Sequence, residues 1–112
     1  MKVAVVGSRN LKVYDFSKFL PENTTEIVSG GARGIDICAR NYAKTHGIKL
    51  TEFFPDYKTY GKIAPLLRNN QIVDYADVVL GFWDGKSTGT VYVIKRCKQK
   101  GVPFKLYKLK TM

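Results

Sequence analysis

The stretch Ile27–Asp36 reads IVSGGARGID, and it decides the fold that we predict for the rest of the chain. It begins as a short apolar strand, passes through a glycine-rich turn and continues into an expected helix. Glycines in the turn allow positive φ and leave no Cβ between the backbone and an approaching ligand. A helix that begins at such a turn points free N–H groups and the positive end of its dipole into the same space. This arrangement is typical of an anion site, most often one for phosphate.

Expected strands alternate with expected helices along the whole chain. Short apolar runs predict strands over 3–6, 25–29, 49–54, 78–83 and 104–109. Apolar residues at helical spacing predict helices over 13–20, 34–46, 64–75 and 90–100, and the polar stretch 56–62 predicts a loop. This alternation is typical of a parallel sheet with right-handed crossovers and helices on both faces. We therefore expect a single α/β domain over residues 1–112, a Rossmann-like three-layer sandwich whose five-stranded parallel sheet has the order 3-2-1-4-5.

Three glycine-containing turns follow the first, second and fourth expected strands. They are Gly7–Arg9, Gly30–Gly34 and Asp84–Gly89. In the expected strand order the switch point lies between the first and fourth strands, and ligands bind there outside the carboxyl ends of the strands. The three turns are therefore expected to line one crevice.

Familiar nucleotide and catalytic motifs do not fit the chain. The turn Gly30–Gly34 is not G-x-G-x-x-G and does not follow the first strand, and Glu52 is expected within a strand rather than at its end, which argues against a dinucleotide-dependent dehydrogenase. The segment Gly81–Ser87 has three residues between its glycines where a P-loop needs four. There is no H-E-x-x-H, no G-x-S-x-G and no metal-ligand spacing, so we expect no metal, with Cys38 and Cys97 as buried free thiols.

The net charge of +10 is unevenly placed, because no acidic residue follows Asp84. A lysine-rich carboxyl-terminal region attracts polyanions such as nucleic acid without sequence preference. Alternatively, these lysines lie on a solvent-exposed helix face and on an edge strand, where they increase solubility. No segment resembles a signal peptide or has the apolar length of a membrane helix, so we expect a cytoplasmic protein with no membrane partner.

Four segments occur together in the order and spacing of a known group of proteins. They are Val5–Arg9 (VVGSR), Ser29–Asp36 (SGGARGID), Ala64–Asn69 (APLLRN) and Phe82–Thr90 (FWDGKSTGT). Together they resemble the SLOG superfamily, a Rossmann-like group that includes the DNA-processing protein A family and the Lonely Guy phosphoribohydrolases. The closest resemblance is to its small single-domain YspA- and YpsA-like branch, and it covers nearly the whole chain. It implies a phosphate-bearing nucleotide or nucleotide-derived ligand in the crevice, no separate cofactor, and self-association as a homodimer or higher homo-oligomer.

The resemblance and the chemistry of the residues indicate the same candidate site. The glycines of the second turn would cradle one side of the ligand, the last helix's N-terminus would hold phosphate, and Arg68 would supply a guanidinium for bidentate contact. The candidate ligand-binding residues are Gly7, Ser8, Arg9, Gly30, Gly31, Arg33, Gly34, Asp36, Arg68, Asn69, Asp84, Gly85, Ser87, Gly89 and Thr90.

Several of these residues have a second interpretation. Asp36 either binds a ribose hydroxyl or complements the dipole of its own helix. Arg9 either contacts phosphate or pairs with an acidic neighbour, and Ser8 and Asn69 are equally suited to turns and caps. Trp83 either stacks on a base or belongs to the core.

One position separates the chain from the phosphoribohydrolases. Their P-G-G-x-G-T-x-x-E motif ends in a glutamate that assists N-glycosidic cleavage, and Val93 stands at its position here. Acid/base chemistry would then need Asp36 or Asp84, and the catalytic residues stay unassigned. The leading hypothesis is binding or sensing of a phosphate-containing nucleotide. The alternatives are a nucleoside-monophosphate N-glycosidase and single-stranded DNA binding through the carboxyl-terminal lysines.

Overall fold

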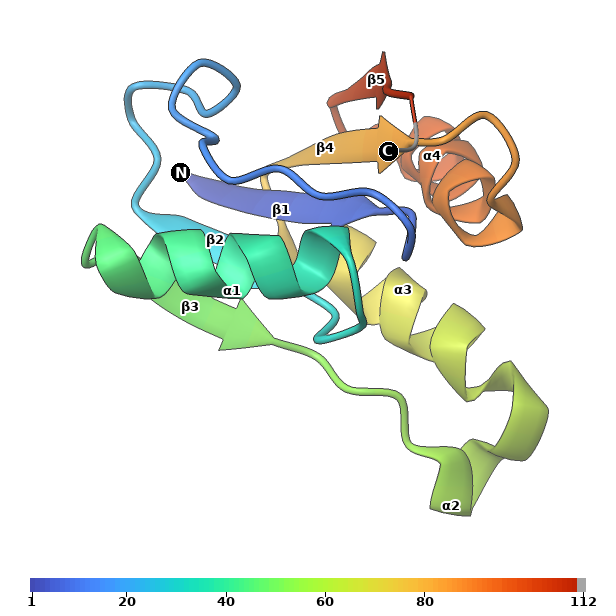
Figure 1. The fold of residues 1–112 in the computed structure, drawn as a ribbon. Helices are drawn as coiled ribbons and strands as arrows, with labels where there is room; N and C mark the ends of the chain where they lie inside the picture. Colours follow the sequence, from blue (N-terminus) through green and yellow to red (C-terminus); the bar gives the residue numbers. More distant parts are fainter. Residues whose placement is uncertain (111–112) are drawn as a thin grey trace.

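The computed structural model describes residues 1–110, which form a five-stranded sheet covered by helices on both faces (Figure 1). All neighbouring strands are parallel and their order is β3-β2-β1-β4-β5, which confirms the predicted sheet. In chain order the elements are β1 (Lys2–Gly7), β2 (Glu26–Ser29), α1 (Ile35–Thr45), β3 (Lys49–Glu52), α2 (Tyr57–Tyr60), the 3₁₀ helix η1 (Gly61–Ile63), α3 (Ala64–Tyr75), β4 (Val78–Trp83), α4 (Thr88–Lys100) and β5 (Phe104–Lys108).

The central strand β1 builds the cores on both faces of the sheet. Its side chains alternate between the faces, as the period of a strand requires. Val3 and Val5 pack in one core with α1, while Ala4 and Val6 pack in the other with α3 and α4. The unbroken apolar run of β1 therefore marks a strand that is covered on both sides.

The helix predicted over 13–20 is wrong, because this segment forms irregular turns. Its apolar residues are nevertheless used: Phe16 is completely buried and packs edge-on against Tyr42 and Phe82, with 5.5 Å between ring centroids in both pairs. Asp15 accepts a hydrogen bond from the Ser17 backbone N–H at 2.9 Å. Such local side-chain bonds compete with helical ones, so the segment becomes an anchored loop.

The loop predicted over 56–62 is also wrong, because α2 and η1 form there. Asp56 caps α2 by accepting a hydrogen bond from the Thr59 N–H at 3.1 Å. Figure 1 shows α2 at the tip of an arm that extends from the body of the fold between β3 and α3. The residues on this arm are thus presented to solvent beside the sheet's carboxyl edge.

Element boundaries differ from prediction near β3 and α4. The strand β3 ends at Glu52, so this carboxylate lies at the strand end and not within the strand, and it pairs with Arg40 at 2.9 Å. The helix α4 begins at Thr88, two residues before the predicted start at Thr90.

The two cysteines are free thiols, as predicted, but they differ in burial. Cys97 is completely buried, and this burial raises the pKa of its thiol to about 11. Cys38 is only half-buried, which corrects the expectation that it lies in the core. Within residues 1–110, no helix combines the length and the apolar character needed to cross a membrane.

Candidate functional site

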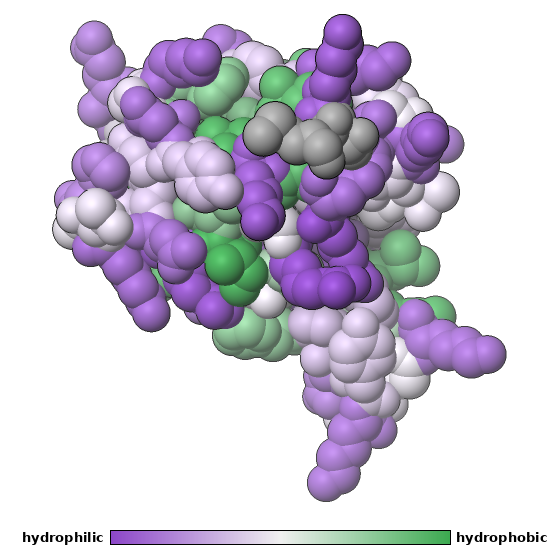
Figure 2. All heavy atoms as spheres, viewed as in Figure 1, coloured by the Kyte–Doolittle hydropathy of each residue, from purple (hydrophilic) through white to green (hydrophobic). Residues whose placement is uncertain are grey.

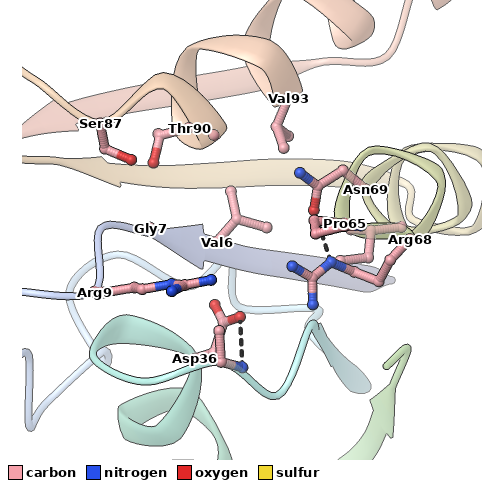
Figure 3. A pocket seen from close by; sticks show the side chains of 13 residues that line it. Val6, Gly7, Arg9, Asp36, Pro65, Arg68, Asn69, Ser87, Thr90 and Val93 are labelled. Atoms are coloured by element: carbon pink, nitrogen blue, oxygen red, sulfur yellow. Dashed lines mark hydrogen bonds between the residues drawn. The ribbon is translucent and has the colours of Figure 1, made fainter. Parts of the chain in front are cut away.

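A pocket of about 130 Å³ lies at the carboxyl ends of β1 and β4, where the strand order changes direction (Figure 3). We call it the crevice. Its walls are the end of β1 and the loop that follows, the first turn of α1, one face of α3 and the N-terminus of α4. Eight of the predicted site residues line it together: Gly7, Arg9, Asp36, Arg68, Asn69, Ser87, Gly89 and Thr90.

A second pocket of about 250 Å³, which we call the side hollow, adjoins the crevice. The two share Arg9, Ala32 and Arg68 as lining residues. The predicted residues Gly30, Gly31 and Arg33 line the side hollow and not the crevice itself.

Four predicted site residues line neither of these pockets and hold the surrounding turns. The Ser8 hydroxyl accepts a hydrogen bond from the Asp84 N–H at 3.1 Å, which ties the turn after β1 to the turn after β4. Asp84 in turn accepts hydrogen bonds from the N–H groups of Lys86 and Ser87, both at 2.8 Å. These bonds hold the pKa of the Asp84 carboxyl below its ordinary value. Gly85 bends the same turn with φ of 88°.

Gly34 fixes the distance between α1 and the turn after β1. Its φ is 76°, a left-handed conformation, and a Cβ built on it would lie 2.5 Å from the Arg9 carbonyl oxygen. Only glycine satisfies both the conformation and the close approach. The first turn of α1 therefore reaches the crevice because this position has no side chain.

Arg68 is buried in the wall of the crevice and is held there by two hydrogen bonds. Its Nε donates to Asn69 Oδ1 at 2.8 Å, and its Nη1 donates to the Gly30 carbonyl oxygen at 2.5 Å. Burial lowers the pKa of Arg68, against the opposing effect of Asp36. Figure 3 shows the guanidinium directed into the crevice. Because a guanidinium has five N–H donors, two such bonds leave donors for a ligand.

Asp36 places a carboxylate in the same crevice and is only 6% exposed. Its Oδ2 accepts a hydrogen bond from the Ala32 N–H at 3.1 Å, while its Oδ1 is buried with no hydrogen-bond partner. Burial raises the pKa of this carboxyl from 3.8 to about 6, although the Ala32 bond and Arg68 oppose the shift. A buried polar atom without a partner is uncommon in folded proteins, and a ligand donor would satisfy it.

The N-terminus of α4 closes the opposite side of the crevice. Its first residues make no side-chain capping bond, and a Cβ built on Gly89 would meet nothing within 4 Å. Thr90 is buried at the pocket wall beside the half-buried Ser87. Trp83 donates its indole N–H to the Ser87 carbonyl oxygen at 3.0 Å and so anchors the turn that leads into the helix. Free N–H groups, hydroxyls and the positive helix end thus face one space.

The charges of the crevice suit an anion. Arg9 extends over it in Figure 3. Among residues 1–110 the ion pairs are Arg40–Glu52, Lys49–Glu26 and Lys100–Asp74, so Arg9 is not neutralised by an acidic partner there. The same residues hold no cluster of three potential metal ligands.

Val93, which stands where the phosphoribohydrolases have a glutamate, lines the crevice and is buried. Asp84 lies outside the crevice, which leaves Asp36 as the carboxylate that lines it.

Sequence reasoning missed Tyr57 and Pro55, which line the side hollow. The available signal was the pair Tyr57 and Tyr60, which lie in the stretch 56–62 that was predicted to be a polar loop. That the residues lining the crevice and the side hollow contact a ligand stays a prediction.

Comparison with known proteins agrees with this architecture. Residues 1–56 match the family model described as DNA recombination-mediator protein A. Gene 61 protein of Mycobacterium phage D29 is 36% identical over 83 residues, which is 69% of this chain and 66% of that protein. DNA processing protein A from Helicobacter pylori, solved for its single-stranded DNA binding mode, has a TM-score of 0.72 and 23% identity over 95% of this chain and 64% of that one.

The chain spans just under two thirds of the length of both relatives. The likeness to the solved structure confirms the Rossmann-like fold, and the family match covers both β1 and the glycine turn after β2. The predicted relationship to the SLOG superfamily is confirmed, and the chain belongs to the DNA recombination-mediator protein A family.

Proposed function

We propose that the crevice binds the phosphate of a nucleotide unit and that this unit belongs to a single-stranded DNA. One observation carries the proposal: Arg9, Arg68 and the open N-terminus of α4 converge on one pocket at the sheet's switch point. Guanidinium groups supply planar, paired donors for phosphate, and a helix N-terminus adds N–H groups and a positive dipole. The combination favours phosphate over a carboxylate or a neutral ligand.

Two findings support a strand as the source of the phosphate. The Helicobacter pylori relative is described as binding single-stranded DNA. In addition, the net charge of +10 supplies the sequence-independent attraction on which nucleic-acid binding rests.

A free nucleoside monophosphate is the second candidate ligand, favoured by Asp36. The unpartnered Oδ1 of this residue would accept a hydrogen bond from a ribose hydroxyl or a base N–H within the small crevice. Its carboxyl would also be the acid or base of an N-glycosidase reaction, because no other carboxylate lines the crevice. Release of free base from nucleoside monophosphates, measured by chromatography, tests that activity directly.

The proposal is tested by fluorescence anisotropy with a labelled oligothymidylate and the variants Arg68→Ala and Thr90→Val. We expect Arg68→Ala to weaken binding by about tenfold or more, because a hydrogen bond to a charged group contributes roughly 1.5–3 kcal/mol. Thr90→Val keeps the shape of the side chain and removes only its hydroxyl, so we expect a smaller loss.

Lys44→Ala is the matched control for charge. It removes one positive charge from the last turn of α1, about 12 Å along the helix from the crevice-lining Asp36. We expect it to bind like the parent. Thermal melts of each variant separate lost binding from lost folding. Binding of nucleoside monophosphates without binding of the oligonucleotide would favour the second candidate, and binding of neither would contradict both.

A further inference from the structure

We infer that the side hollow is a second nucleotide subsite, in which a base stacks on Tyr57 and the adjoining phosphate meets Arg33. The inference rests on the proposed function, because a second subsite next to the first is meaningful only for a strand. It predicts that the protein recognises at least two consecutive nucleotides.

The side hollow adjoins the crevice and shares lining residues with it. Arg9 and Arg68 line both pockets, so a strand bound in the crevice would reach the side hollow past these two side chains. Its volume of about 250 Å³ is larger than that of the crevice. The space is therefore sufficient for a planar group in addition to a phosphate oxygen.

The side hollow combines an aromatic ring with several cations. Tyr57 lies at the start of α2 with 55% of its surface exposed, and it lines the hollow together with Arg33 and the two shared arginines. No acidic residue is among the residues that line it. Arginines alone would suit any anion, but an exposed ring beside them matches the base and phosphate of one nucleotide.

The backbone supports this arrangement. The Phe54 ring covers Gly31 so closely that a Cβ there would lie 2.2 Å from a ring carbon. This contact places the start of the α2 arm against the glycine turn after β2, which brings Tyr57 to the edge of the hollow. Figure 2 shows the arm standing out from the body, with hydrophilic and intermediate side chains mixed over its surface. Because Tyr57 is more than half exposed, its ring is presented to an incoming strand and is not part of a core.

The first experiment compares 5′-phosphorylated oligothymidylates of one to four nucleotides in binding to the parent protein. We expect the dinucleotide to bind about tenfold more tightly than the mononucleotide, because one stacked base typically adds that much affinity. Tyr57→Leu should abolish this gain and leave mononucleotide binding unchanged, whereas Tyr57→Phe should retain it. Arg33→Gln should weaken the dinucleotide and spare the mononucleotide.

A second readout reports stacking itself. A dinucleotide carrying 2-aminopurine loses fluorescence when that base stacks, so we expect quenching with the parent and with Tyr57→Phe but not with Tyr57→Leu. Tyr14→Leu is the matched control, because Tyr14 is 78% exposed and lines neither the crevice nor the side hollow. It should behave like the parent in both assays.

The outcomes separate the subsite from the proposed function. Equal affinity for one and two nucleotides would overturn the subsite, and so would a Tyr57→Leu variant that binds the dinucleotide as tightly as the parent. Loss of binding in Arg68→Ala would still support the crevice in either case. Binding of no nucleotide of any length would overturn both. An effect of Tyr57→Leu on self-association measured by sedimentation, with nucleotide binding intact, would assign the ring to a protein contact and overturn the subsite.

Discussion

Burial of Asp36 disfavours the ionised form of its carboxyl, and this has a measurable effect on the free energy of unfolding. Its pKa is raised from 3.8 to about 6, so between these pH values the folded protein binds more protons than the unfolded chain. The free energy of unfolding therefore falls as pH rises through this window. We predict that Asp36→Asn is more stable than the parent at pH 7 by as much as ~3 kcal/mol, since one pKa unit corresponds to about 1.36 kcal/mol.

Urea unfolding at pH 4 and pH 7 checks this prediction. The advantage of Asp36→Asn should be present at pH 7 and nearly absent at pH 4, where the parent carboxyl is mostly protonated in the folded state. Asp77→Asn is a suitable control, because Asp77 is exposed and accepts a hydrogen bond from the Lys2 N–H outside the crevice. If the parent and Asp36→Asn are equally stable at pH 7, burying the ionised Asp36 carboxylate costs no free energy, which would contradict the prediction.

The same carboxyl makes ligand binding depend on pH. Phosphodiesters keep their charge between pH 5 and 7.5, so a change in oligonucleotide affinity over this range reports groups on the protein. Above about pH 6 Asp36 becomes ionised beside the bound phosphate and repels it. We predict that binding weakens as pH rises from 5 to 7.5 and that Asp36→Asn removes most of this dependence. Anisotropy titrations at constant ionic strength measure it, and equal pH profiles for parent and variant would refute it.

At the residue scale, the sequence was informative where the chemistry is local to a turn. Asp36 and Thr90 were found because each opens an expected helix beside a glycine turn. Arg68 was found because a polar residue on an otherwise apolar helix needs a partner or a ligand. Tyr57 was missed because its place beside Arg68 depends on the path of the α2 arm, which no periodic pattern records. The division between crevice and side hollow is likewise set by packing between segments distant in sequence.

At the scale of elements, the α1 helix depends on the glycine that precedes it. Gly34 and Gly47 both have positive φ, 76° and 65°, but only Gly34 is crowded, since a Cβ at Gly47 would meet nothing within 4 Å. We predict that Gly47→Ala costs about 1 kcal/mol of stability, the backbone strain alone. Gly34→Ala should cost clearly more, because the new methyl group collides with the Arg9 backbone. Denaturant unfolding of both variants compares them, and equal losses would show that the contact at Gly34 relaxes freely.

The elements themselves were predictable wherever apolar periodicity was long and its ends were marked. The pattern from Ile35 to Ala43 and the glycine after His46 define α1 almost to the residue. The segment 13–20 has helical spacing too, yet Asp15 and the buried Phe16 favour turns, because packing of one ring against the core outweighs a marginal helix. In 56–62 the capping residue Asp56 was visible, but a single helical turn leaves no periodic signal.

At the scale of the molecule, strand order was predictable because right-handed crossovers and the buried β1 leave few arrangements open. The distribution of charge over the surface was not predictable, since a count of lysines does not say which edge of the sheet they occupy. The parallel sheet resolves this point. Strand β5 ends at the same edge as the crevice, and the Lys108 side chain lies 3.0 Å from the Cβ that Gly85 would carry. The last turn of α4, which carries Lys98 and Lys100, lies about 15 Å along that helix from its crevice-lining N-terminus.

This geometry divides the carboxyl-terminal lysines into two groups with different expected effects on DNA affinity. Each phosphate neutralised on a single strand contributes about 0.7 to the slope of log affinity against log salt. We predict that the double variant Lys108→Gln/Lys110→Gln lowers this slope by roughly 1.4, because Lys108 ends β5 at the crevice edge of the sheet and Lys110 follows it. Lys98→Gln/Lys100→Gln removes the same charge at the opposite end of α4 and should leave the slope nearly unchanged. Oligothymidylate titrations from low to moderate salt measure both variants. If both double variants lower the slope by the same amount, the lysines act only through overall charge. If neither variant changes the slope, the lysines serve solubility and do not contact DNA.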